Sequence, residues 1–204
     1  MMSTRYFTLI LLIGILLAGC AGAGNQEANK EETSEKASNV ETDAKPEAET
    51  ILKDTEDNNI GTVSFFENGD QIQIEADIKG LTPGHHGFHL HENGVCEADA
   101  PDGPFTTAGG HFNPDGKDHP DHAGDLPSLY VNEDGQAKYS ASFDRVTMKQ
   151  MTEGPLAVVI HAGPDNFGNI PERYESEGKT GPDKETVKAG DAGDRQACGV
   201  ITTN

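Results

Sequence analysis

Short extended segments in which apolar and polar residues alternate dominate the chain from about residue 51 onward. The clearest is 71–79, QIQIEADIK, where three isoleucines and Ala76 alternate with polar residues. A period of two is typical of a strand with one face in the core. The segment TVSFF at 62–66 precedes it, and the intervening ENGD contains an Asn-Gly pair, which favours a tight turn. We therefore predict an antiparallel hairpin over 62–79.

Later segments extend this β-pattern. Residues 129–131 and 138–143 predict a second hairpin about Asp134-Gly135. The run LAVVI at 156–160 is continuously apolar, as in a fully buried strand. No segment behind the N-terminal region shows a helical period.

These patterns predict an all-β fold over residues 51–204. We expect a Greek-key antiparallel β-sandwich or flattened barrel of the immunoglobulin-like kind. Two long loops, 92–125 and 162–195, are the expected carriers of function.

The N-terminal region has a different texture. Residues 6–19 form an apolar run behind Arg5 that is too short to span a bilayer comfortably, so we interpret 1–19 as a signal peptide. Its end, Leu17-Ala18-Gly19-Cys20, resembles the lipobox of bacterial lipoproteins, which predicts that Cys20 carries the lipid. An ordinary cleaved signal and an uncleaved anchor are the alternatives, and all three imply that the remainder is exported.

Residues 20–50 contain no aromatic residue and, apart from Val40, no large aliphatic one. Such a segment cannot bury enough apolar surface to offset its ordering entropy, so we predict a disordered acidic linker that follows the lipidated Cys20. The formal net charge of -20 argues against a nucleic-acid partner and against electrostatic adhesion to anionic lipids. Membrane attachment therefore has to come from the lipid.

Cys96 and Cys198 remain if Cys20 is lipidated. An even count in an oxidising compartment predicts a disulfide between them, with two free buried thiols as the alternative.

Candidate metal ligands are concentrated in the stretch 109–125, GGHFNPDGKDHPDHAGD. It contains His111, His119, His122 and Asp125, the imidazole and carboxylate groups that bind a borderline-soft divalent metal. The alternative is a hydrophilic surface loop that is rich in histidine.

Other histidines lie at strand positions. In 87–91, GFHLH, the H-x-H spacing puts His89 and His91 on one face of a strand and the apolar residues on the other. His161 directly follows the apolar run at 156–160. Together with the loop, these residues supply seven candidate ligands, enough for two adjacent metals that share one residue.

Five segments resemble the copper/zinc superoxide dismutase family, in the family's order: GHHGFHLHENGVC (84–96), AGGHFNPDGKDH (108–119), DHAGDLPSL (121–129), VVIHAGPDN (158–166) and GDAGDRQACGVI (190–201). The resemblance covers nearly the whole predicted domain. It implies copper ligands at His89, His91, His111 and His161, and zinc ligands at His111, His119, His122 and Asp125. His111 is then the ring shared by both metals.

The resemblance also implies roles for other residues. Asp165 corresponds to the family's carboxylate that accepts hydrogen bonds from one ligand of each metal, expected here to be His91 and His119. His86 corresponds to a structural histidine behind the site, and Arg195 to the arginine that stands over copper and receives the anion. Cys96 and Cys198 match the family's disulfide.

The implied activity is dismutation of superoxide to dioxygen and hydrogen peroxide, with His111 as both ligand and proton donor. The enzyme would protect the cell exterior against superoxide. A lipid anchor would hold it on the outer face of the membrane or on its periplasmic side. A non-catalytic zinc- and copper-binding lipoprotein of the same fold is the alternative. No motif reports the oligomeric state.

Two loop lengths depart from the family pattern. His119 and His122 are only three apart, which shortens the zinc loop. Residues 167–189 are longer than the usual channel loop, and Ala189 stands where a threonine is common. In the loop 162–195, Lys184, Lys188 and Arg195 are the candidates for attracting superoxide against the net negative charge.

Overall fold

The computed structural model describes residues 45–176 and 178–204. The predicted signal peptide 1–19, Cys20 and the linker as far as residue 44 lie outside the described residues. Within the described part of the chain, no helix is long and apolar enough to cross a membrane.

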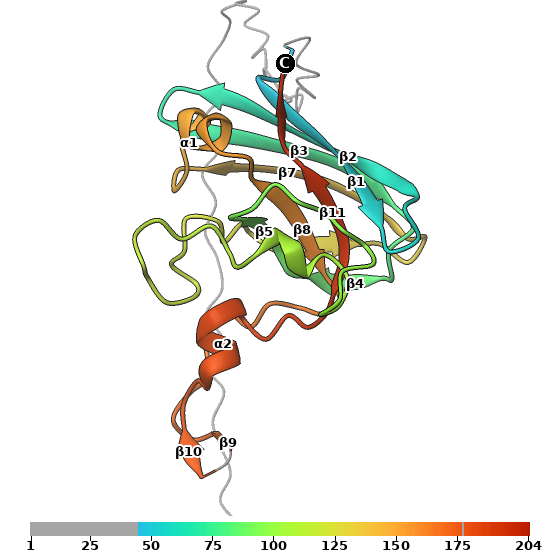
Figure 1. Cartoon of the computed structure of the whole chain (residues 1–204). Helices are drawn as coiled ribbons and strands as arrows, with labels where there is room; N and C mark the ends of the chain where they lie inside the picture. Colours follow the sequence, from blue (N-terminus) through green and yellow to red (C-terminus); the bar gives the residue numbers. More distant parts are fainter. Residues whose placement is uncertain (1–44, 177) are drawn as a thin grey trace, which may run out of the picture. The chain divides into compact units, whose positions relative to one another are not determined.

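The described residues form a predominantly β structure (Figure 1). The strands are β1 (Ala48–Asp54), β2 (Asn59–Asn68), β3 (Gln71–Lys79), β4 (Gly84–His86), β5 (Phe88–His91), β6 (Leu129–Val131), β7 (Gln136–Phe143), β8 (Ala157–His161), β9 (Glu175–Ser176), β10 (Lys179–Thr180), β11 (Arg195–Val200) and β12 (Thr202–Thr203). The helical elements are the 3₁₀-helix η1 (Thr106–Ala108) and the α-helices α1 (Met148–Glu153) and α2 (Lys184–Ala189).

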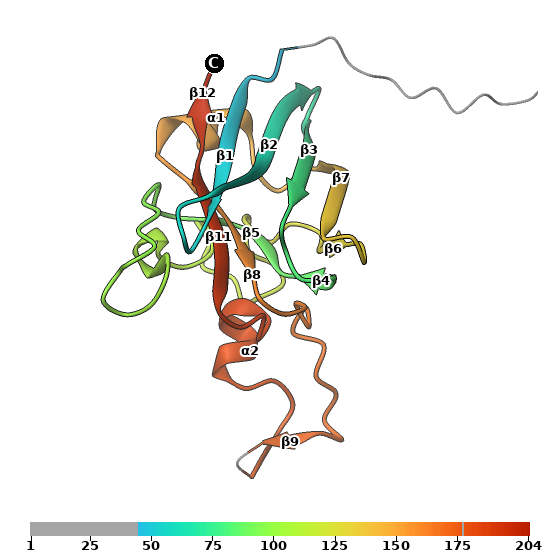
Figure 2. The same ribbon diagram turned by 90° about the vertical axis from the view of Figure 1, so that its right-hand side faces the viewer.

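One curled antiparallel sheet carries most of the structure. Its strand order is β5-β8-β11-β1-β2-β3-β7, with β12 also paired to β1, so strands far apart in sequence lie side by side (Figure 2). A small second sheet pairs β4 with β6. The predicted all-β antiparallel fold is confirmed, and the curled sheet favours the flattened-barrel form of the prediction.

Alternation along the strands builds the core inside this curl. In β1 and β3 every second residue is buried, and Leu52, Ile74 and Ile78 are at most 1% exposed. By contrast, all five residues of β8 are buried, as the continuous apolar run predicted. Val158 and Ile160 lie in the main apolar cluster, whereas Ala157 and Val159 lie in a second, smaller one, so β8 is packed on both faces.

The first predicted hairpin is confirmed with a different turn. β2 and β3 pair over eight positions, and Asn68 lies opposite Gln71. The loop is therefore Gly69-Asp70, and Gly69 adopts a positive φ of 63° that glycine tolerates without steric cost. The Asn-Gly pair located the turn, but its asparagine is the last residue of the strand.

The second predicted hairpin is wrong in its pairing. β6 and β7 both form, but β6 pairs with β4, and β7 pairs with β3 along eight positions. The ladder with β3 gives β7 eight cross-strand pairs, more than a three-residue β6 could provide. Proximity in sequence therefore gave the wrong partner.

Two short helices and an earlier domain start also differ from the sequence predictions. Each α-helix has six residues, fewer than two turns, which is too short for a periodic pattern to indicate. A capping box between Thr147 and Gln150 marks the start of α1 and was the available signal. β1 begins at Ala48, so the folded domain starts before the predicted residue 51.

The predicted disulfide is present and ties a long loop to the principal sheet. Cys96 lies in the loop after β5, and Cys198 lies in β11, 102 residues away in sequence, with Cα atoms 5.6 Å apart. Cys198 is buried in a small apolar cluster with Phe105 and Val159. The loop is therefore attached to the sheet beside β8.

We expect the disulfide to stabilise the fold strongly. In the chain-entropy model, closing a loop of this length is worth about 4–5 kcal/mol. The paired substitution Cys96→Ala and Cys198→Ala should lower the free energy of unfolding of the metal-free protein by that order, measured by urea denaturation. Reduced wild-type protein is the control and should match the variant. Equal stability of the oxidised and doubly substituted proteins would contradict the expectation.

Candidate metal centre

The strand β5 presents two histidines to the site and two apolar residues to the core. Phe88 and Leu90 are fully buried in the main apolar cluster. His89 and His91 point to the opposite face and are also fully buried. β5 pairs with β8, whose last residue is His161. Two neighbouring strands therefore supply three imidazoles from a rigid support.

The loop 109–125 lies along β5 and brings in the remaining ligands. Leu90 accepts a hydrogen bond from Phe112 N and donates one to Gly124 O, at 2.8 and 2.9 Å. Isolated bridges also place His111 opposite His91 and Asp125 opposite His89. The backbone of β5 thus fixes both ends of the loop.

The seven predicted ligands come together in two groups that share His111. One group contains His89, His91, His111 and His161, and the other contains His111, His119, His122 and Asp125. Within each group, one nitrogen or oxygen atom per residue lies within 4.8 Å of all the others, and every residue is buried. The geometry therefore matches the sequence assignment of two adjacent metal sites, residue by residue.

The first group leaves four buried nitrogens without a hydrogen-bond partner in the protein: His89 Nδ1, His91 Nε2, His111 Nε2 and His161 Nε2. An unpaired buried polar atom costs about 1–3 kcal/mol, and four at one point call for a common partner. A cation coordinated by imidazole satisfies all four together, and this donor set suits copper. The residues therefore fit the metal.

The opposite nitrogen of each imidazole is held by a hydrogen bond. His91 Nδ1 lies 3.0 Å from Gly109 O, and His161 Nδ1 lies 3.0 Å from Gly193 O. Such bonds fix the tautomer and the ring orientation, so the free nitrogen faces the site.

In the second group, Asp125 forms the centre of contacts. Its Oδ1 lies 2.7 Å from His111 Nδ1 and 3.2 Å from His122 Nδ1, and its Oδ2 lies 2.9 Å from His119 Nδ1. Three imidazole nitrogens and one carboxylate converging in this way form the closed four-ligand set typical of zinc.

Asp165 connects the two groups. Its Oδ2 lies 2.8 Å from His89 Nε2, and its Oδ1 lies 2.8 Å from His119 Nε2. The prediction that Asp165 pairs with His91 is wrong. The Nδ1 atom of His91 instead contacts the Gly109 carbonyl. Either histidine of the H-x-H pair satisfies the sequence pattern, and only the fold distinguishes them.

Burial keeps three histidines of the copper group, His91, His111 and His161, neutral. Desolvation lowers the pKa of His91 well below its usual value, and neighbouring histidines and Arg195 reinforce the shift. Desolvation likewise lowers the pKa of His161 to about 3. For His111, burial lowers the pKa to about 4 although the hydrogen bond that His111 donates to Asp125 opposes the change. Neutral imidazoles at pH 7 are in the form that binds metal.

The zinc group carries its own negative charge. Burial opposes the charged form of His119, but hydrogen bonds to Asp125 and Asp165 outweigh it and raise the pKa to about 9. Burial also opposes ionisation of both carboxyls, and the same hydrogen bonds lower their pKa values well below the usual range. Two carboxylates are thus available to balance a divalent cation.

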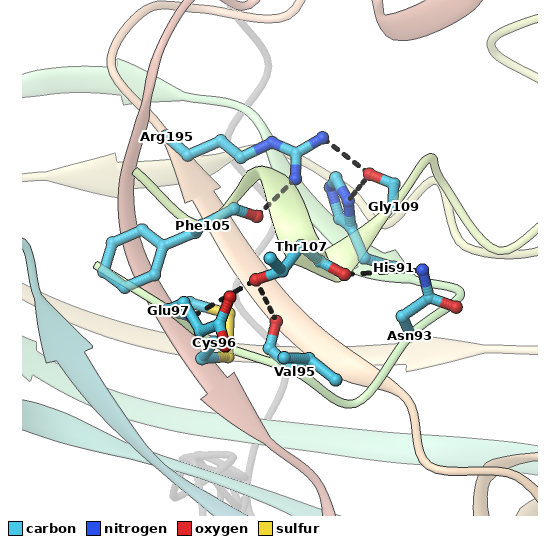
Figure 3. The surroundings of a disulfide bond; sticks show 10 residues. His91, Asn93, Val95, Cys96, Glu97, Phe105, Thr107, Gly109 and Arg195 are labelled. Atoms are coloured by element: carbon cyan, nitrogen blue, oxygen red, sulfur yellow. Dashed lines mark hydrogen bonds between the residues drawn. A yellow bond between two sulfur atoms is a disulfide. The ribbon is translucent and has the colours of Figure 1, made fainter. Parts of the chain in front are cut away.

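Arg195, at the start of β11, is positioned by two backbone carbonyls of the loop that follows β5 and contains Cys96. Its Nη1 donates to Phe105 O at 2.5 Å and its Nη2 to Gly109 O at 2.6 Å (Figure 3). The same Gly109 oxygen contacts His91 Nδ1. The half-buried guanidinium is therefore held close to a copper ligand, and Cys96 anchors the loop that holds it. Burial lowers the pKa of Arg195, yet a guanidinium stays charged at neutral pH.

The other two residues named as candidates for attracting superoxide lie on α2. Lys184 and Lys188 belong to α2, and the Lys188 side chain is 71% exposed and lies 4.0 Å from Glu185. His86, by contrast, lies behind the site as predicted, with Nδ1 2.7 Å from His161 O and Nε2 2.8 Å from Thr82 O.

Sequence reasoning missed the contribution of Glu92. Its backbone N donates to Gly110 O, and its Oε1 accepts from Gly110 N, both at 3.0 Å. This double contact holds the residue before His111. Only the Glu92 position directly after the H-x-H strand could have indicated it.

Comparison with known proteins gives the same result as the geometry. Residues 59–201 match the family described as copper/zinc superoxide dismutase (SODC). The chain is 44% identical over 170 residues to the "Superoxide dismutase [Cu-Zn]" of Mycolicibacterium paratuberculosis, covering 78% of this chain and 75% of that protein. It is 36% identical over 172 residues to "Superoxide dismutase [Cu-Zn] 2" of Aquifex aeolicus, covering 78% and 87%.

A further relative, the "Superoxide dismutase [Cu-Zn]" of Mycobacterium tuberculosis, is 48% identical over 130 residues. That match covers 59% of this chain and 54% of the relative, so this chain spans about half of that protein's length. With the family match across the folded domain and both ligand groups intact, the chain belongs to the copper/zinc superoxide dismutase family.

Proposed function

We propose that the protein dismutes superoxide outside the cytoplasm, where a lipid attaches it to the membrane. Arg195 and His111 are its catalytic residues. In the balanced reaction, two superoxide ions and two protons give one dioxygen and one hydrogen peroxide. The observation that carries the proposal is the convergence of four buried, unpartnered imidazole nitrogens at one point. Copper bound there supplies the one-electron exchange with superoxide.

His111 is suited to hold and deliver a proton. Its Nδ1 lies 2.7 Å from Asp125, whereas its Nε2 faces the copper group without a protein partner. Burial lowers its pKa to about 4, so a proton placed on Nε2 is readily released. A weakly basic group of this kind is an efficient donor to the strongly basic peroxide.

Arg195 is suited to attract and orient the anion. It is a fixed positive charge beside His91, and two carbonyls restrict its position. A cation in a narrow, partly desolvated site raises the arrival rate of an anion and does not favour neutral molecules.

The disulfide supports a location outside the cytoplasm, since such bonds persist in oxidising compartments. The lipid anchor rests on the Leu17-Ala18-Gly19-Cys20 pattern, which lies outside the described residues. One lipid-bearing cysteine followed by a polar linker would leave the folded domain free in the surrounding medium.

The copper assignment is tested by His91→Ala. The variant should lose more than about 100-fold in dismutase activity. Removing only the hydrogen-bond partner of a metal ligand typically costs roughly 10–100-fold, and here the ligand itself is lost. Zinc content should stay at one per chain, because His91 belongs only to the copper group. Activity and metal content are measured after loading with both metals. His85→Ala, which removes an exposed histidine outside both groups, is the control and should be fully active. Undiminished activity of the His91 variant would overturn the assignment.

Arg195→Ala tests electrostatic attraction. We expect the second-order rate constant to fall by about tenfold or more, within the range of steering effects, and its dependence on ionic strength to weaken. Arg195→Lys should retain much of the salt dependence. Arg173→Ala removes an exposed arginine of the long loop, beside Tyr174, and should change the rate little. If the Arg195 and Arg173 variants behaved alike, Arg195 would have no special role.

Cys20→Ser tests the anchor in bacterial cells that express the full chain with its own leader. The unsubstituted protein should partition into the detergent phase, and its N-terminal peptide should carry acyl chains by mass spectrometry. The variant should appear in the aqueous phase with its specific activity unchanged, because Cys20 lies outside the folded domain. Partition of both proteins into the aqueous phase would refute lipidation at Cys20.

A further inference from the structure

The long segment 166–190 contacts the zinc ligand His119 at both of its ends. It begins next to Asp165, which holds the His119 ring, and it ends at Gly190, just after α2. Asn166 N donates to Gly190 O at 2.9 Å, so the two ends are also joined to each other. The segment is therefore a closed loop, and its two ends meet beside His119.

The first contact is made by Gly168. This residue has a φ of 65°, and a β-carbon added to it would come within 2.8 Å of His119 O and 3.5 Å of the Pro120 ring. Only a residue without a side chain can approach the His119 backbone this closely.

The second contact is made by α2. His119 N donates to Val187 O at 2.9 Å, so the zinc loop satisfies a carbonyl in the last turn of the helix. Gly190 follows with a φ of 62°. A β-carbon there would overlap Asp165 Oδ1 and come within 2.6 Å of His119 Nε2. Gly190 thus packs directly on the hydrogen bond between Asp165 and His119.

The helix itself is well fixed. Asp183 caps it by accepting a hydrogen bond from Thr186 N at 2.9 Å, and Gly190 N donates to Thr186 O at 2.9 Å. Thr186 is 4% exposed, which places one face of this short helix against the domain. The contacts to His119 therefore come from an ordered element.

The distal part of the segment is different. The strands β9 and β10 are exposed, and they form a hairpin that projects from the domain beyond α2 (Figures 1 and 2). Gly178, at this hairpin, has a φ of 77°, and nothing lies within 4 Å of an added β-carbon. Only the proximal part of the segment supports the zinc loop.

We propose that Gly168, α2 and Gly190 form a clasp that positions His119 for zinc. His119 and His122 are separated by only Pro120 and Asp121, so the zinc loop has little chain of its own to define the His119 position. The long segment supplies that definition from outside. The proposal depends on the zinc group and not on turnover at copper.

Four single substitutions of glycine by alanine test the clasp. Gly168→Ala and Gly190→Ala place a methyl group against His119 or its partner, whereas Gly178→Ala and Gly69→Ala meet nothing within 4 Å. All four positions have φ between 62° and 77°, so the backbone strain is matched. Differences between the two pairs therefore report the contacts and not the strain.

The measurement is zinc dissociation from the fully loaded protein into an excess of a chromophoric chelator. We expect both clasp variants to release zinc about 10–100-fold faster than the unsubstituted protein, the range for loss of a ligand's support. The two control variants should stay within about twofold of it. With Co²⁺ in the zinc site, the clasp variants should also show a changed visible absorption spectrum, which a general loss of stability would not produce.

Equal zinc release from all four variants would overturn the proposal, as would an unchanged Co²⁺ spectrum in both clasp variants. Gly168→Ala makes the milder contact, so it keeps the test valid if Gly190→Ala fails to fold. Because the readouts use zinc and cobalt only, they are independent of dismutase activity. Failure of the proposed catalysis would leave these rates unchanged.

Discussion

The structure depends on burying seven metal-binding side chains around two points without leaving their polar atoms unpaired. Each imidazole of the copper group uses one ring nitrogen to contact the protein and directs the other to a common point. Isolated nitrogens buried in this way would be unfavourable, but one cation pairs them all. The pairing of β5 with β8 holds three of these rings, so the sheet sets their relative positions.

Two separate connections couple the copper and zinc groups. His111 belongs to both groups through its two ring nitrogens, and Asp165 joins His89 to His119. A displacement of the zinc ligands is therefore transmitted to the copper group through an imidazole and through a carboxylate. Zinc has no redox role, but it fixes the ring that carries the proton and the carboxylate that orients His89. The loop 109–125 thus acts on the copper group in two ways, through His111 itself and through the ligands that hold the zinc.

The sequence predicted all seven ligands, because the spacing of some follows from local geometry and the family resemblance implied how they divide between two metals. The alternation in 87–91 requires His89 and His91 to share a face, and His161 follows a strand whose burial is evident from composition. What failed depended on contacts between distant segments. β7 pairs with β3 and not with its neighbour β6, and Asp165 contacts His89 and not His91. The helices α1 and α2 have too few turns to produce a periodic signal, and the carbonyls that hold Arg195 carry no signature in side-chain sequence.

The net charge of -20 opposes the approach of an anionic substrate, but screening limits the range of this repulsion. At physiological ionic strength charges are screened over about 8 Å, so acidic groups further away on the surface contribute little at the site. The exposed Lys188 is close to Glu185, which reduces its long-range effect as well. Arg195, held beside His91 by two carbonyls, is a permanent positive charge at the site itself, where copper and zinc would add theirs when bound. The carbonyls of Phe105 and Gly109 therefore set the position of a local charge that opposes the overall negative charge of the chain.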